Sequence, residues 1–153
     1  MGSASNRPPI VSKEDLAERL IEDKERVLAS WMKRVREEVP SARDKDSFYL
    51  RDHLPELLKH LGCALKEPGR IKELTQVIKL GAEHGRQRAR SHDYRLQDII
   101  KEYGLLQETI FNLDTGDTPL SSEAAIIVSR FIEISINKAT DDFLHCTEKK
   151  TEK

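Results

Sequence analysis

The chain has 153 residues, with 26 Lys and Arg against 27 Asp and Glu. This length is typical of one compact domain. The formal net charge of -1 argues against a nucleic-acid-binding protein, because such domains carry a basic surface. Charged residues make up 35% of the chain, which predicts a heavily solvated exterior.

The longest uninterrupted apolar run covers residues 124–128, far short of the roughly 18 residues that a membrane span needs. We therefore expect no membrane insertion. Cys63 and Cys146 are isolated, which fits a reducing cytoplasm and gives no metal-binding framework. Residues 1–11 contain no apolar secretory core, and we expect them to be disordered or left over from cloning.

The first expected helix covers residues 12–39. Ser12 is a good N-cap, and Asp15 stands at the third position of a capping box. The apolar residues that follow are spaced by three, four or seven, as in an amphipathic helix. A second helix is expected over residues 50–66, because Pro55 then falls in its first turn.

Three more helices are predicted after these, over residues 70–91, 95–113 and 121–153. The few Gly and Pro residues fall mostly between segments of helical period, and no strand-like alternation is present. The expected fold is therefore all-α: a four- to five-helix bundle, with a globin-like arrangement as one option, that ends in a long C-terminal helix.

The last predicted helix is apolar on two sides. One stripe comprises Val128, Ile132, Ile136, Ala139 and Phe143. A second stripe of Ile127, Phe131 and Ile134 lies more than a quarter turn away. A single bundle buries one side, so we expect the second stripe to be the interface of a homodimer. Residues 12–146 are then the helical domain, and the charged residues 147–153 begin a helical linker to a downstream domain.

No motif for catalysis is recognisable. The chain lacks Gly-x-Ser-x-Gly, a phosphate-binding loop and His-Glu-x-x-His. His53, Glu56 and His60 could form part of a metal site, but the paired Glu-x-x-His motifs of a di-iron bundle are missing. We therefore expect no catalytic residue, no metal and no cofactor.

Residues 79–95 are the most distinctive stretch, with a local net charge of +3. A solvated basic face is one interpretation. The other is that His84 and Arg88, four residues apart, point inward. Gly81 and Gly85 would then let a neighbouring helix or a ligand approach closely.

A buried arginine needs a carboxylate partner, and Glu102 on the following helix is the candidate for Arg88. A buried Tyr103 would need a hydrogen bond, and His84 or Arg88 could supply it. Trp31, the single tryptophan, is expected to be a core residue.

Four segments together resemble a known module: residues 50–58 (LRDHLPELL), residues 84–90 (HGRQRAR), Tyr94 and residues 100–106 (IKEYGLL). They are similar to the RsbRD-type N-terminal domain of bacterial sensor histidine kinases, which also occurs in stressosome regulators. The resemblance implies an all-helical input domain that dimerises and passes a signal through its last helix. It implies no catalytic residue. His84, Arg88, Glu102 and Tyr103 fall on its motifs and are the expected ligand-binding or regulatory positions.

The sequence thus predicts a cytoplasmic, non-enzymatic sensory and dimerisation module of a bacterial two-component histidine kinase. Its partners would be a second copy and a kinase domain in cis. Two alternatives stay open. One is a globin-like haem sensor with His84 as axial ligand. The other is a partner-binding helical scaffold without a small ligand.

Overall fold

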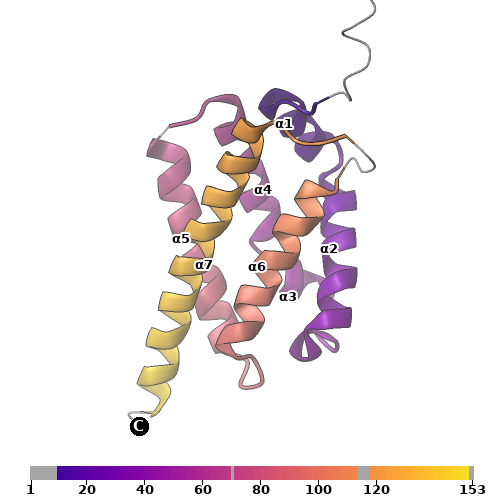
Figure 1. The fold of residues 1–153 in the computed structure, drawn as a ribbon. Coiled ribbons are helices and arrows are strands. Elements are labelled where there is room, and N and C mark those ends of the chain that lie inside the picture. Colours follow the sequence, from indigo (N-terminus) through magenta and orange to yellow (C-terminus); the bar gives the residue numbers. More distant parts are fainter. Residues whose placement is uncertain (1–9, 70, 114–117, 152–153) are drawn as a thin grey trace, which may run out of the picture.

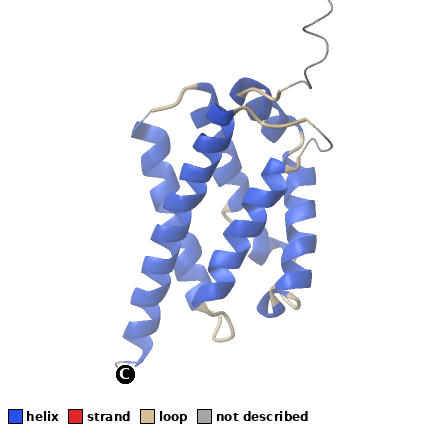
Figure 2. Cartoon of the chain, viewed as in Figure 1, coloured by secondary structure: helices blue, strands red, loops and turns tan. Residues whose placement is uncertain are grey.

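The computed structural model describes residues 10–69, 71–113 and 118–151, with the backbone alone for residues 149–151. This part of the chain is a bundle of α-helices (Figure 2). Its β pairing is confined to one isolated bridge between Val11 and Leu120. The prediction of an all-α bundle with a long C-terminal helix is confirmed.

The helices are α1 (Lys13–Glu22), α2 (Lys24–Glu38), α3 (Ser47–Arg51), α4 (Leu54–Lys66), α5 (Ile71–Ala89), α6 (Leu96–Phe111) and α7 (Ser122–Thr151), with a short 3-10 turn at Pro40–Ala42. Helix α7 packs against both α5 and α6. Behind them, α4 packs against α1 and α5, and α2 packs against α6. The last turns of α7 extend past the neighbouring ends of α5 and α6 (Figure 1).

The expected first helix is divided in two at Asp23. Its start is as predicted, because the Ser12 hydroxyl accepts a hydrogen bond from the Asp15 amide at 3.1 Å. Asp23 then leaves helical geometry, with φ -107° and ψ 21°, and serves as C-cap of α1 and N-cap of α2. The break lets α1 pack on α4 while α2 packs on α6.

The expected second helix also has a break. It begins earlier, as α3, and resumes as α4 after Asp52 and His53. Pro55 lies in the first turn of α4, as predicted. Because Pro55 has no amide hydrogen, it cannot bond the carbonyl of Arg51, and an uninterrupted helix through this point is disfavoured.

The last three helices lie within two residues of their predicted bounds wherever the structure describes them. The expected start at Arg70, the turn over residues 114–117 and the last residues 152–153 lie outside the described residues.

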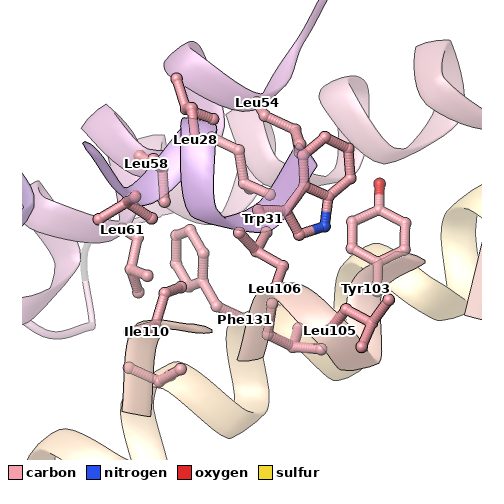
Figure 3. Packing of buried hydrophobic residues seen from close by; sticks show 14 of the residues in the cluster. Leu28, Trp31, Leu54, Leu58, Leu61, Tyr103, Leu105, Leu106, Ile110 and Phe131 are labelled. Atoms are coloured by element: carbon pink, nitrogen blue, oxygen red, sulfur yellow. The ribbon is translucent and has the colours of Figure 1, made fainter. Parts of the chain in front are cut away.

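The core is continuous through the bundle, and Trp31 is central to it (Figure 3). Trp31 is only 1% exposed, which confirms its predicted role. Its indole Nε1 donates a hydrogen bond of 2.9 Å to the backbone carbonyl of Glu102. One buried contact therefore joins α2 to α6.

The expected N-terminal boundary was placed too late. Residues 1–9 lie outside the described residues, but Val11 is 3% exposed and belongs to the core. Its amide donates to Pro119 at 2.9 Å, and its carbonyl accepts from Ser121 at 2.8 Å. These bonds fix the chain entry beside the start of α7.

The two apolar stripes of α7 do not separate as cleanly as predicted. Phe131, expected on the outer stripe, is 7% exposed and lies among the core side chains (Figure 3). It still lines a surface hollow between the end of α4, the start of α5 and α7. Ile127 and Ile134 are half-buried and line the same hollow. Among the described residues, no helix is both long and apolar enough to cross a membrane.

Candidate functional site: a buried ion-pair cluster

A buried ion pair joins Arg88, in the last turn of α5, to Glu102 of α6. Both side chains are at most 1% exposed. Arg88 Nε donates to both carboxylate oxygens of Glu102 at 3.1 Å, and Nη2 donates to Oε2 at 3.0 Å. The structure confirms the predicted pairing of these two residues.

The remaining donors of Arg88 are also satisfied. Nη2 donates to the carbonyl of Leu50 at 3.0 Å, and Nη1 donates to the carbonyl of Tyr49 at 3.1 Å. Nη1 also reaches the side-chain oxygen of Gln87 at 2.9 Å. Both carbonyls lie near the C-terminal end of α3, where helical carbonyls lack intrahelical donors. Arg88 thus ties α5 to α6 and to α3.

Glu102 has two further donors. Nε2 of His84 lies 2.9 Å from Oε1, and the hydroxyl of Tyr94 donates to Oε2 at 3.0 Å. An ionised carboxylate only accepts hydrogen bonds, so Nε2 of His84 carries the proton in this contact. The four side chains of His84, Arg88, Tyr94 and Glu102 form what we call the polar cluster.

The charge state of the polar cluster follows from its contacts. Burial by itself would raise the pKa of Glu102, but the Arg88 guanidinium and the His84 bond lower it to about 2. Burial and the nearby Arg88 lower the pKa of His84, against the opposing effect of Glu102. At neutral pH the cluster therefore holds one cation, one carboxylate and a neutral imidazole.

Aromatic rings enclose the cluster. The Arg88 guanidinium lies 4.7 Å from the ring centroid of Tyr49 and 5.2 Å from that of Tyr94. Tyr103 packs edge-on against His84, with ring centroids 5.1 Å apart. Tyr103 was expected to bond His84 or Arg88 through its hydroxyl, but the contact found is ring to ring. The hydroxyl bond to the cluster comes from Tyr94 instead.

Tyr94 was missed as a cluster residue and Tyr49 as a ring beside it, although Tyr94 is one of the four segments that carry the resemblance. Tyr94 precedes α6, and the chain must fold back after α5 to bring its hydroxyl to Glu102. No helical spacing indicates that placement. The two backbone carbonyls at the end of α3 carry no residue-type signal at all.

On the side of α5 adjacent to His84 and Arg88, two glycines contact α7, which confirms the predicted close approach of a neighbouring helix. A Cβ on Gly81 would lie 3.1 Å from the Ser135 carbonyl oxygen, and one on Gly85 would lie 2.1 Å from that of Ala139. Ser135 and Ala139 are themselves small and at most 1% exposed. Because Gly85 directly follows His84, one short segment of α5 both contributes to the polar cluster and contacts the backbone of α7.

The histidines considered as metal ligands make local ion contacts. His60 lies 2.6 Å from Glu73 and 3.7 Å from Glu56. His53 lies between Asp52 and Glu83, at the break before α4. Within residues 10–69, 71–113 and 118–148, no three His, Cys, Asp or Glu side chains are grouped so as to hold a metal ion.

Comparison with known proteins gives no relative: no protein-family model, curated protein or solved structure matches the chain. The functional assignment therefore rests on the geometry of the polar cluster and its connection to α7.

Proposed function

We propose that this chain is a non-catalytic sensory and dimerisation module of a bacterial sensor histidine kinase, acting in the cytoplasm, in which the polar cluster is the regulated region and α7 carries the output. One observation supports this most directly. The α5 segment that holds Glu102 through His84 and Arg88 also contacts the backbone of α7 through Gly81 and Gly85. A change in the cluster that moves α5 would displace α7.

A buried, fully bonded ion pair suits a two-state element. Its partners lie on different helices, and rearranging them means exchanging several strong bonds at once. Small shifts at such a site are amplified because packed interfaces have discrete arrangements rather than a continuum. A signal that exchanges the hydrogen bonds of Arg88 would therefore move α7 from one packed position to another.

The dimerisation part of the proposal draws on an apolar face shared by α5 and α7. Ile71, Leu74 and Ile78 recur at i, i+3 and i+7 on α5 and are 40–78% exposed. They adjoin Ile127 and Ile134 of α7 around two neighbouring hollows. A contiguous exposed apolar face of this kind is typical of an interaction site. The homodimer interface would thus include α5, with Phe131 as a largely buried lining residue of the first hollow.

The haem-sensor alternative gains no support from His84. An axial ligand needs a free ring nitrogen facing a cavity. Here Nε2 is bonded to Glu102, Tyr103 covers the ring, and the side chain is 2% exposed.

The test is a set of chimeras in which α7 continues directly into the catalytic core of a histidine kinase. Linkers lengthened by zero to seven residues rotate the core by about 100° per residue relative to α7. We expect autophosphorylation to vary periodically with linker length and to return near seven added residues. Activity independent of linker length, together with a monomer in sedimentation, would favour the scaffold alternative.

The chimeras also test the cluster. With the most active linker, Glu102→Gln should change autophosphorylation several-fold while circular dichroism shows a folded chain. Gly104→Ala is the matched control on the same helix, because a Cβ there meets no atom within 4 Å. A folded Glu102→Gln chimera with unchanged activity would contradict a regulatory role for the cluster.

A further inference from the structure

The polar cluster is closed to solvent, so a signal from outside needs a path to it. Gln87 provides one. Its side-chain oxygen accepts from Nη1 of Arg88 at 2.9 Å, and its amide nitrogen donates to Oδ2 of Asp52 at 2.9 Å. Gln87 is half-buried, and Asp52 is exposed at the break between α3 and α4. The chain Asp52–Gln87–Arg88–Glu102 therefore runs from the surface into the cluster.

A polar surface hollow of about 210 Å³ lies at the outer end of this path. Asp52 and His53 line it from the α3–α4 break, Glu83, Arg86 and Gln87 line it from α5, and Arg90 lines it from the turn directly after α5. This volume equals that of about seven liquid water molecules at roughly 30 Å³ each, enough for a compound the size of a small amino acid.

The lining carries both signs of charge. Arg86 keeps one bond to Asp142 at 3.2 Å, and Arg90 is exposed with no ion-pair partner among the described residues. On the acidic side, the Glu83 carboxylate lies 3.4 Å from the His53 ring, and Asp52 lies 3.1 Å from the other ring nitrogen. Two arginines and two acidic residues thus line one small hollow.

From this arrangement we infer that the hollow binds a small zwitterion of the α-amino-acid type. Its carboxylate pairs with Arg86 and Arg90, since guanidinium groups bind carboxylates in a two-pronged geometry. Its ammonium group pairs with Glu83 and Asp52. A simple anion would face both carboxylates, and a simple cation would face both arginines, so each is disfavoured.

Binding in the hollow would reach the polar cluster through Gln87. An ammonium group bound to Asp52 would compete with the Gln87 amide for Oδ2. Once released, the Gln87 side chain would no longer accept the hydrogen bond from Arg88. That this change regulates an output rests on the proposed function. The binding itself does not depend on a kinase and is measured on the chain alone.

The binding test is calorimetric titration of the chain with each common L-α-amino acid. For any that binds, the N-acetyl form lacks the ammonium charge and the amide lacks the carboxylate. We expect at least one amino acid to bind with millimolar or better affinity, and both modified forms to bind at least tenfold more weakly. Arg90→Gln should weaken binding at least tenfold, while Arg43→Gln, at an exposed site outside the hollow, should not.

Three results would overturn the site: no amino acid binding at 20 mM, binding unchanged by Arg90→Gln, or equal binding of acetate or phosphate. The last would mean a general anion site.

The path through Gln87 is tested with Trp31 fluorescence, because the Trp31 indole bonds the Glu102 backbone. The bound amino acid should shift this fluorescence in the wild type. Gln87→Leu, similar in size but without both hydrogen bonds, should abolish the shift at an amino-acid concentration that saturates this variant in its own calorimetric titration. A full shift in Gln87→Leu, or loss of binding in it, would overturn the path.

Discussion

Gly85 of α5 lies against the backbone of Ala139 of α7, so close that a Cβ on Gly85 would stand 2.1 Å from the Ala139 carbonyl oxygen. Real Cβ atoms do not approach oxygen so closely, and the obstacle is helix backbone rather than a movable side chain. The distance between α5 and α7 is therefore set by the absence of a side chain at position 85.

Gly85→Ala should destabilise the chain by about 2–4 kcal/mol, because α7 must move away from α5 and lose its packing. Urea denaturation followed by circular dichroism measures this. Gly104→Ala is the control, since a Cβ there meets open space and alanine is the better helix former. It should leave the stability unchanged or raise it by up to about 1 kcal/mol. Equal stability of Gly85→Ala and the wild type would contradict the close packing.

Removing one partner of the buried ion pair should be costly. Arg88→Met leaves the buried Glu102 carboxylate without its cationic partner, and we expect a loss of about 3–5 kcal/mol of folding free energy. The double variant Arg88→Met/Glu102→Leu removes both charges and should recover part of that loss. A double-mutant cycle in urea gives the coupling. Additive losses in the two single variants would show that the pair is not energetically coupled.

Stability should fall as the pH drops below about 6.5. The pKa of buried His84 is lowered from its usual 6.5. Below that pH His84 therefore binds a proton in the unfolded chain but stays neutral in the folded chain, which favours unfolding. The slope should approach about 1.4 kcal/mol per pH unit. Denaturation curves between pH 8 and 5.5 test this. His84→Gln should flatten the decline, whereas His92→Gln, at an exposed position outside the cluster, should leave it in place.

A second loss is expected at more acid pH. The pKa of Glu102 is about 2 in the folded chain, below its ordinary 4.5, so its contribution is complete above pH 4.5 and is lost as the pH falls toward 2. Glu102→Gln should remove this part of the acid transition. An acid transition unchanged in Glu102→Gln would contradict the depressed pKa.

The apolar face of α5 and α7 gives a prediction for association. Wild-type chain should sediment as a dimer at micromolar concentration, and Ile71→Lys should shift it toward monomer without loss of helicity, because Ile71 is 78% exposed. Phe48→Lys is the matched control, since Phe48 is 86% exposed but lies on α3. A wild-type monomer, or equal effects of the two substitutions, would contradict a dimer through this face.

The local spacing of residues in the sequence predicted most of the helices of this protein. The helical period, the Ser12 cap and Pro55 in a first turn indicated where helices lie, because capping and amphipathic patterns act within a few residues. The same reasoning indicated that Arg88 needs a carboxylate and that Gly85 admits a neighbour, since a buried charge and a missing side chain each demand a particular environment.

Tertiary structure decided the rest. Whether Phe131 belongs to the core or to an outer face depends on which helices pack against α7, and the period of α7 alone does not reveal them. Tyr94 and the carbonyls of Tyr49 and Leu50 reach the polar cluster only because the turn after α5 and the break after α3 bring them there. Hydrogen bonds act over about 3 Å in space whatever the separation in sequence, so the full cluster becomes visible only when the helices are assembled.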